Sequence, residues 1–284
     1  MIFALALTSG IASATTHVVN QTAPACIAGD AYYATIQAAI NAANPGDTII
    51  VCHEATAYQE TVVVNKSDIV IKAFNETKPV VSALNIPNNH VFNITDQTNV
   101  TLQGFKIMNA TGTNQSVAGI YMYNASECNI SNNIMTNISA TGTYAAIGIW
   151  LWDSNNNTFS SSTTVSYINA TNEALGIYLS SSTNNTFSSS TTVSYINATH
   201  GAYGILLAGS NDNTFSSSTT VSYINSTNRA YGILLLMSTN NTFSSSTNVS
   251  YINAANKYAF GISLGSSSND NTFSSGSISD VNAP

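Results

Sequence analysis

Charged residues are scarce in this sequence. Only 7% of the 284 residues are Asp, Glu, Lys or Arg, and six Lys and Arg face thirteen Asp and Glu, for a formal net charge of -7. So few cations cannot neutralise a phosphate backbone or form a basic patch that docks on anionic lipid. We therefore expect no nucleic-acid partner. Apolar runs of about 18 residues are also absent, which predicts no transmembrane span.

Cysteine is rare too, with three residues in the chain. Cys26 and Cys52 flank one compact segment and could form a disulfide bond that leaves Cys128 unpaired; three unrelated thiols are the alternative. Residues 1–14 have the apolar core of a secretory signal and end in an Ala-Ser-Ala site, although a positively charged start is missing. Together these features predict export to the extracellular space or the cell surface.

Asn-x-Ser/Thr triplets are frequent. A chain rich in Ser, Thr and Asn produces such triplets by chance, so composition alone and glycosylation of some exposed sites are both open interpretations. The triplets include those that begin at Asn65, Asn75, Asn93, Asn99, Asn109, Asn124, Asn137, Asn169, Asn197 and Asn225.

The second half of the chain repeats one phrase five times. Asn-Thr-Phe recurs in steps of 28, 28, 28 and 30 residues, and each period holds three short β-prone pieces, of the types Gly-Ile-x-Leu, Asn-Thr-Phe-Ser and Val-Ser-Tyr-Ile. A fixed period of this length marks a stacked architecture in which each repeat needs its neighbours to bury its apolar face. We interpret each period as one coil of a parallel β-helix and expect seven to nine coils.

Equivalent positions of successive coils would lie about 4.8 Å apart, one strand spacing. The Phe column is expected to face the core, and the Asn column before it to hydrogen-bond along the stack and satisfy turn groups. A Tyr column has uncertain direction and is expected to serve packing. The columns are Phe159, Phe187, Phe215, Phe243 and Phe273; Asn157, Asn185, Asn213, Asn241 and Asn271; and Tyr167, Tyr195, Tyr223 and Tyr251.

Before the repeats, Ile36, Ala39, Ile40 and Ala43 fall at helical spacing, which predicts one helix over residues 33–43. We divide the chain into a signal-like segment and linker (1–20), an N-terminal cap with the helix (21–60) and the β-helix (61–284). The near-identical repeats begin at about residue 148.

The segment from Thr35 to Val51, with Tyr58-Gln59-Glu60 and the segment from Lys66 to Ile71, resembles the opening of right-handed parallel β-helix proteins of the pectate-lyase-like superfamily. The Gly-Ile-x-Leu and Asn-Asn-Thr phrases are similar to the repeats of its NosD-type branch. The resemblance covers roughly residues 30–280 and implies an all-β, single-stranded right-handed parallel β-helix with an N-terminal capping α-helix. One departure is a longer loop over residues 52–58, where the family has a Gly-Thr-Tyr turn.

This resemblance implies that an enzyme must be considered, a polysaccharide lyase or glycoside hydrolase acting on an acidic polysaccharide. Lyases need carboxylates that hold Ca²⁺ and a basic residue, and hydrolases need a close pair of carboxylates. The repeats show neither pattern, so the sequence favours a non-catalytic protein without a cofactor, with Ca²⁺ expected only for a lyase. The four histidines are far apart in sequence, and no metal site is predicted. Candidate catalytic residues from the non-repeat coils are Glu127 and Asp153, with Glu54, Glu60 and Asp96 behind them.

Side-chain alternation in the Gly-Ile-x-Leu strand predicts an outward ridge of aromatic rings, because Trp150 and Trp152 face out if Ile149 and Leu151 face in. Flat aromatic faces are a usual platform for sugar rings. The alternative is that these rings only cover the sheet. The candidate ligand-binding residues are Tyr121, Tyr123, Trp150, Trp152 and Tyr178; the same face continues as Leu206, Leu234 and Leu236, which would suit a protein partner if exposed.

The approach to this strand varies between otherwise similar coils, as expected of ligand-facing loops or of drift at a solvated turn. We predict a secreted or cell-surface scaffold, non-catalytic, that contacts glycans or neighbouring proteins; the alternatives are the enzyme and a purely structural adhesin or cell-wall repeat. End-to-end or lateral self-association is also expected, because the sequence stops after a repeat-like Ser-Ile-Ser-Asp without a polar cap. The variable positions are Tyr144, Glu173, His200, Arg229 and Lys257.

Overall fold

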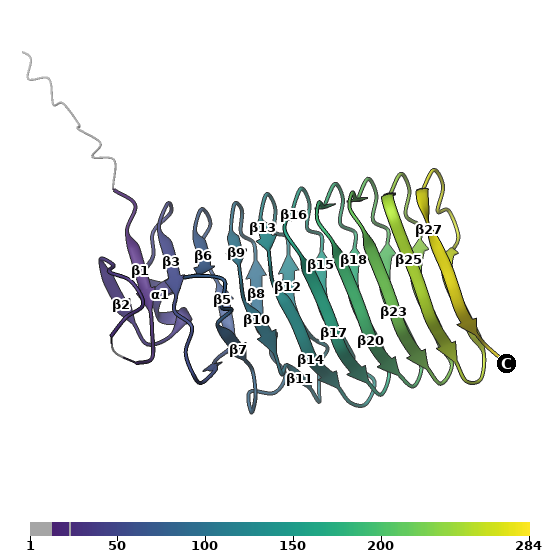
Figure 1. Cartoon of the computed structure of the whole chain (residues 1–284), viewed down its shortest axis with the longest axis horizontal. Coiled ribbons are helices and arrows are strands. Elements are labelled where there is room, and N and C mark those ends of the chain that lie inside the picture. The colour runs from purple at the N-terminus through teal and green to yellow at the C-terminus, as the bar shows by residue number, and fades with distance from the viewer. Residues whose placement is uncertain (1–12, 23) are drawn as a thin grey trace, which may run out of the picture.

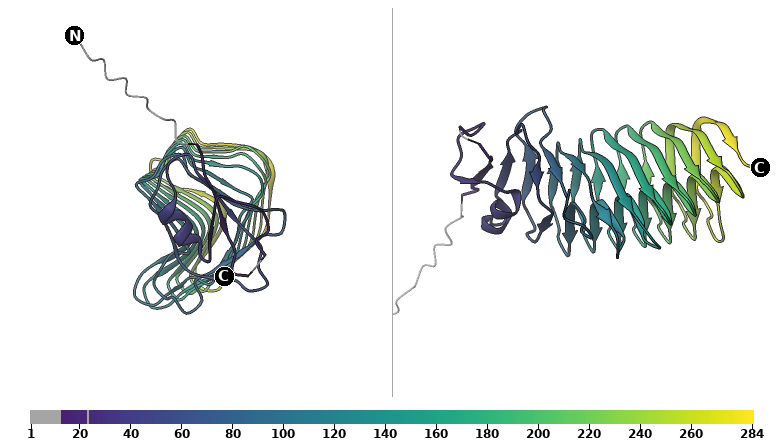
Figure 2. Two further views of the ribbon diagram at one scale, coloured as in Figure 1. Left: turned by 90° about the vertical axis from the view of Figure 1, so that its left-hand side faces the viewer. Right: turned by 90° about the horizontal axis from the view of Figure 1, so that it is seen from below.

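The strands of this protein pair in parallel with their counterparts one coil away and wind into a β-solenoid of about 10 turns (Figures 1 and 2). The computed structural model describes residues 13–22 and 24–284, so the predicted signal over residues 1–14 lies almost wholly outside the described residues. The all-β parallel solenoid is confirmed. The turn count exceeds the expected seven to nine because strands before residue 61 also join the stack, as where Thr48 pairs with Val70.

Three faces make up each coil, as the repeat phrases predict. The first is an eight-stranded sheet, hereafter the outer sheet, and the other two merge where long strands run around a corner. The outer sheet contains β5 (Val62–Val64), β8 (Phe92–Thr95), β12 (Val117–Tyr123), β15 (Ala145–Trp152), β18 (Glu173–Ser180), β21 (Gly201–Ala208), β24 (Arg229–Leu236) and β26 (Tyr258–Leu264).

The second face is built mostly from short strands, and the third, hereafter the tyrosine face, from longer ones. The second contains β1 (Thr16–Val19), β2 (Ala31–Tyr33), β3 (Thr48–Val51), β6 (Val70–Ala73), β9 (Thr101–Gln103), β13 (Asn129–Ser131), β16 (Thr158–Phe159), β19 (Thr186–Phe187), β22 (Thr214–Phe215) and the starts of β25 (Thr242–Ala254) and β27 (Thr272–Asn282). The tyrosine face contains β4 (Tyr58–Gln59), β7 (Val80–Ser82), β10 (Lys106–Met108), β11 (Thr111–Gly112), β14 (Ile134–Ala140), β17 (Thr163–Ala170), β20 (Thr191–Ala198), β23 (Thr219–Ser226) and the ends of β25 and β27.

The phenylalanine column lies in the core, as the repeat predicts. Phe187 and Phe215 are buried and stack with their ring centroids 4.4 Å apart, and the other members continue the stack at 4.3 to 4.7 Å. Full burial of one such side chain stabilises the fold by about 1.5 to 3 kcal/mol. One repeated letter therefore supplies a continuous apolar spine.

The asparagine column is buried beside the phenylalanines and satisfies the turns, which confirms the ladder expected from the sequence. The Asn213 carboxamide accepts from the backbone N–H of Asn185 at 2.9 Å and donates to the carbonyl oxygen of Ser182 at 2.9 Å. It also donates to Oδ1 of Asn241 at 3.1 Å, and the pattern repeats from coil to coil.

A glycine column gives the outer sheet its shape. At Gly176 a Cβ atom would overlap a γ-methyl group of Val193 and crowd the carbonyl oxygen of Gly204, and the equivalent glycines in neighbouring coils are equally confined. Leu175 directly before this glycine and Tyr178 two residues after it both belong to one outer cluster, while Ile177 between them lies in the core. The outer sheet therefore carries facing rows of side chains instead of a simple alternation.

The N-terminal coils are fixed by α1 (Ile36–Ala42), shorter than the predicted 33–43, and by the Cys26–Cys52 disulfide bond. Thr35 caps the helix by accepting from the Ala38 backbone N–H, and the Glu60 carboxylate accepts from the first two helical N–H groups. The described residues contain no helix with the length and apolarity that a membrane crossing requires.

Candidate functional site

Aromatic side chains gather on the outer sheet where the sequence places the ridge. Tyr121 pairs in register with Trp150, and Trp150 with Tyr178, so the three rings follow one another across adjacent coils. Trp152 lies parallel to Trp150, with ring centroids 5.9 Å apart and planes 7° apart, and is 42% exposed. We call these residues, with Tyr123 and His90, the aromatic patch.

His90 completes the patch, and the sequence analysis missed it. Its ring stacks on Tyr121 at 4.3 Å and meets Trp150 edge-on at 6.2 Å. Spacing was the one available signal. His90 lies 28 residues, which is one period, before Ala118, and Ala118 pairs with Ile147 in the next coil. The small Ala118 side chain follows His90 one coil later.

The protonation of His90 follows from its surroundings. Nδ1 of His90 accepts from the Ala118 backbone N–H at 2.9 Å, so the neutral ring carries its proton on Nε2. Burial lowers the pKa of His90 to about 4, so the ring is neutral at pH 7. His90 therefore presents an N–H donor to the patch without a positive charge.

Trp150 holds a second N–H group, which its neighbours cover. Its indole Nε1 is buried and has no hydrogen-bond partner. Buried polar groups are nearly always satisfied in native proteins, and an exception points to a functional role or a missing partner. The aromatic patch thus combines the exposed ring of Trp152 with a covered, unpartnered N–H on Trp150. It suits a ligand with apolar surface, and with oxygen acceptors that reach this N–H when the side chains over it move.

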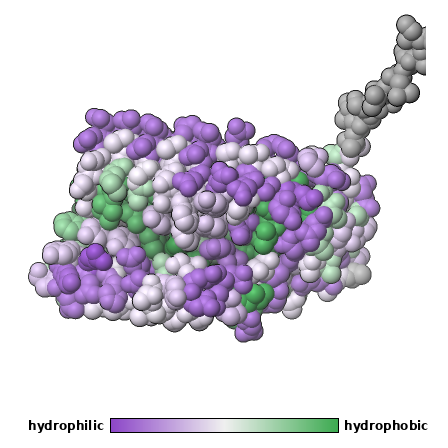
Figure 3. Space-filling model, turned by 180° about the vertical axis from the view of Figure 1, so that it is seen from behind, coloured by the Kyte–Doolittle hydropathy of each residue, from purple (hydrophilic) through white to green (hydrophobic). Residues whose placement is uncertain are grey.

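The aliphatic continuation of this face is less open than the sequence allowed. Leu206 and Leu234 are only 9% and 7% exposed, because the glycine column brings them against Leu175, Tyr203 and neighbouring side chains. A protein-binding leucine patch requires exposed leucines, and these two positions are therefore unsuited to it. Seen from the side opposite to Figure 1, apolar side chains gather in a band along the molecule, with polar side chains above and below (Figure 3).

The candidate carboxylates sit in turns. Glu127 and Asp153 are exposed and have left-handed backbone, with φ of 57° and 48°. Other coils place Asn at the same positions, as at Asn156 for Glu127 and Asn124 for Asp153. Left-handed backbone favours Asn and Asp, so turn geometry accounts for Asp153, and nothing in the turn explains a Glu at 127. Asp96 occupies the same turn position one coil earlier and accepts from the Asn124 amide at 2.7 Å.

The two N-terminal candidates hold backbone. Glu54 accepts from the backbone N–H groups of Gln21 and Thr22, and Glu60 caps α1. The pKa of Glu60 is raised because burial disfavours its charged form more than its two backbone donors favour it. No three His, Cys, Asp or Glu side chains gather closely enough to hold a metal ion in the part of the chain that the structure describes.

The variable positions separate into two groups. Tyr144 packs against the core, and Glu173 accepts from the Tyr203 hydroxyl at 3.4 Å. The remaining three, His200, Arg229 and Lys257, line one hollow at the edge of the outer sheet. Sequence spacing put them one coil apart, and the structure brings them together.

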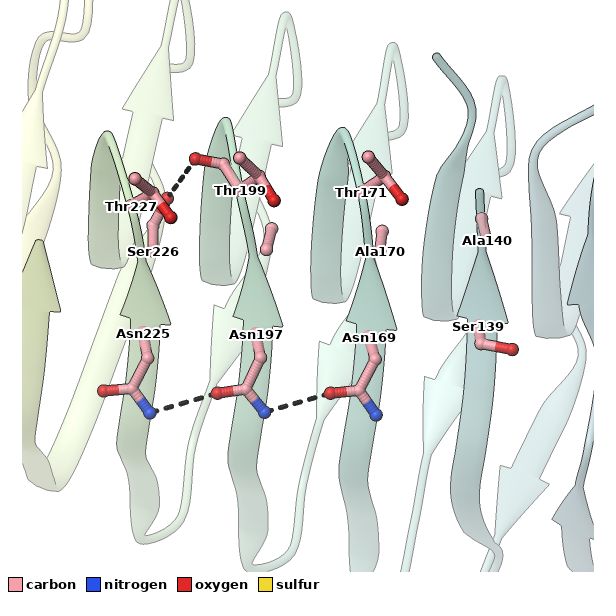
Figure 4. A pocket seen from close by; sticks show the side chains of 11 residues that line it. Ser139, Ala140, Asn169, Ala170, Thr171, Asn197, Thr199, Asn225, Ser226 and Thr227 are labelled. Carbon is pink, nitrogen blue, oxygen red and sulfur yellow. Dashed lines mark hydrogen bonds between the residues drawn. The ribbon is translucent and has the colours of Figure 1, made fainter. Parts of the chain in front are cut away.

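The tyrosine face carries an exposed array of its own. Tyr195 and Tyr223 stack 4.8 Å apart, are 39% and 38% exposed and have φ of 56°, so this column stacks outside the core instead of packing into it. Beside it, Asn197 donates to Asn169 at 3.0 Å and accepts from Asn225 at 3.1 Å, along a shallow hollow of about 560 Å³ (Figure 4). Because the tyrosine rings cover one another's faces, this array offers edges instead of a flat platform.

Comparisons with known proteins give fold likeness alone. No protein-family model matches the chain, and no curated protein sequence matches it. Solved structures similar to it include an alginate lyase from Paenibacillus sp. str. FPU-7, 12% identical over 86% of this chain and 94% of that chain, with a TM-score of 0.39. Another is a pectin methylesterase from carrot, 10% identical over 95% and 89%, with a TM-score of 0.34. These values carry no argument about activity, and nothing in them identifies the NosD-type branch.

Proposed function

We propose that this protein is a non-catalytic binding scaffold, exported from the cell, that holds a glycan on the aromatic patch. The observation that carries the proposal is the unpartnered indole N–H of Trp150 beside the exposed ring of Trp152. Sugar rings present apolar C–H faces to aromatic planes and hydroxyl oxygens to N–H donors. The patch offers both kinds of contact on one sheet.

Rigidity supports binding at this surface. Trp150 and Trp152 stand on β15, and Tyr178 stands on the neighbouring parallel strand β18. The Trp150 ring stacks with both others, so a bound ligand would restrict little remaining side-chain motion. Preorganised side chains lower the entropic cost of association. The neutral state of His90 also favours an uncharged acceptor, because no desolvated cation has to be compensated.

Export is supported by the Cys26–Cys52 bond, since disulfide bonds persist in oxidising compartments. The scarcity of ionic groups agrees with a surface that relies on Ser, Thr and Asn for hydration. The non-catalytic part of the proposal is supported at Asp153, because its left-handed turn position carries Asn in the preceding coil.

The test is retention of the protein on immobilised neutral and acidic polysaccharides, with the soluble fraction assayed for unsaturated products and new reducing ends. Trp152→Ala should weaken retention about tenfold or more, as expected for an exposed aromatic anchor. Trp150→Phe keeps a ring and removes the N–H, so it should weaken retention by a smaller factor.

Tyr251→Ala is the matched control, because Tyr251 is a comparably exposed ring (44%) on the tyrosine face. It should leave retention unchanged. Equal retention of wild type and Trp152→Ala would refute the binding proposal. Product release that disappears in Glu127→Gln or Asp153→Asn would instead establish the enzyme, and absence of retention together with self-association would favour a mechanical role.

A further inference from the structure

Two cationic side chains and a histidine line one pocket at the edge of the outer sheet. His200, Arg229 and Lys257 come from consecutive coils, and Tyr258 forms part of the wall of a hollow of about 590 Å³. Their backbones are tied together, because the Arg229 N–H donates to the His200 carbonyl oxygen at 3.2 Å and the Tyr258 N–H donates to the carbonyl oxygen of Asn228 at 3.1 Å. We call this the cationic pocket.

The concentration of charge here is unusual for this chain. Only six of its residues are Lys or Arg, and Arg229 and Lys257 are the two that follow Lys106. No carboxylate lines the pocket. Within residues 13–22 and 24–284, no Asp or Glu side chain lies within salt-bridge distance of Arg229 or Lys257, so neither cation is neutralised by a protein carboxylate there.

Such an arrangement works against stability when the pocket is empty. Arg229 begins β24 and pairs in register with Tyr258, so Lys257 lies just before its partner position on the next coil. Like charges this close in adjacent coils repel each other. The side chains of Arg229 and Lys257 also make no hydrogen bond to the described residues, and the pocket amides of Asn228 and Asn256 likewise make none. The pocket therefore presents exposed N–H donors that have no acceptor among the described residues.

We infer that the cationic pocket binds an oxyanion, a sulfate, phosphate or carboxylate group carried by a ligand. The Arg229 guanidinium offers two parallel N–H donors to such a group, and Lys257 adds a second charge from the next coil. An oxyanion between them removes their mutual repulsion and satisfies both. This site is separate from the aromatic patch and does not depend on glycan binding there.

The experiment titrates the intact protein with sodium sulfate against sodium chloride at matched ionic strength, following amide resonances of the pocket residues. Parallel titrations use inorganic phosphate and acetate. Wild type should respond saturably to sulfate and not to chloride, and Arg229→Gln and Lys257→Gln should each bind about tenfold more weakly. A response to acetate as well extends the site to carboxylates, and a response to sulfate and phosphate alone assigns a tetrahedral oxyanion.

Lys66→Gln is the control for a cation removed elsewhere, and Trp152→Ala is the control for the aromatic patch; both should bind sulfate like wild type. As a second readout, sulfate should raise the thermal unfolding midpoint of wild type above its value in chloride, and this gain should vanish in Arg229→Gln. The inference is overturned if no anion gives a saturable response, if Arg229→Gln binds as well as wild type, or if Lys66→Gln loses as much binding.

Discussion

Replacing Asn213 with alanine should destabilise the solenoid far more than replacing Asn197 with alanine. Each of the two belongs to a ladder in which asparagines of successive coils hydrogen-bond to one another. Asn213 is fully buried, and its side chain is the acceptor for the backbone N–H of Asn185 and the donor to the carbonyl oxygen of Ser182. Alanine removes both hydrogen bonds, and the site is too deeply buried for solvent water to replace them.

The magnitude follows from counting the groups left without a partner. After Asn213→Ala, the Asn185 N–H and the Ser182 carbonyl are both buried and unsatisfied, while the Asn241 carboxamide still accepts from the backbone N–H of residue 213. Each unsatisfied buried group costs about 1 to 3 kcal/mol, so the expected loss is about 4 kcal/mol. Asn197 is half-buried beside solvent, and water replaces its ladder partners, so Asn197→Ala should cost about 0.5 kcal/mol or less.

Guanidinium unfolding followed by far-UV circular dichroism measures both variants against wild type. The expected result is a large fall in the unfolding midpoint for Asn213→Ala and a midpoint close to wild type for Asn197→Ala. Equal effects of the two substitutions, or a cost below about 1 kcal/mol at Asn213, would refute the reasoning that the buried ladder serves to satisfy turn groups.

Two further predictions concern the glycine column and the aromatic patch. Gly176→Ala should cost about 3 kcal/mol through overlap with Val193, whereas Gly209→Ala, which faces open space at φ of 58°, should cost only about 1 kcal/mol through backbone strain; similar unfolding midpoints for the two would contradict this. His90 has its pKa lowered from 6.5 to about 4, so the unfolded chain takes up a proton at this ring between those pH values and the folded chain does not. The stability contributed by the neutral ring is therefore complete above pH 6.5 and declines as the pH falls toward 4. His90→Phe should remove that part of the pH dependence of stability. An unchanged pH profile in this variant would show that the burial of His90 does not cause the pH dependence.

Much of the fold could be predicted because the repeat length matches one coil. Once a period of 28 residues is assigned to a turn, identical letters must lie one strand spacing apart, which fixes the Phe187 and Asn213 columns without coordinates. Strand alternation predicted the outward direction of Trp150 and Trp152. For the cysteines the sequence left two alternatives, a Cys26–Cys52 disulfide bond or three unrelated thiols, and the structure contains the bond.

The candidate site was less predictable. His90 contacts Tyr121 and Trp150 only because three coils pack in register. The residues next to His90 in the sequence form no pattern that predicts an aromatic neighbour. That Arg229 and Lys257 line one pocket depends on how the start of β24 lies against the turn before β26, which spacing alone leaves open.

The sequence by itself determined the winding of this protein, its spine of phenylalanines and its buried amide ladder, because a periodic sequence leaves one way to stack equivalent positions. The tertiary structure decided what each face displays. Left-handed backbone at Tyr195 turns a regular column outward, and the glycine at 176 brings two rows of outer side chains together. Both effects depend on dihedral angles and close contacts between coils, and these are set only when the whole solenoid is packed.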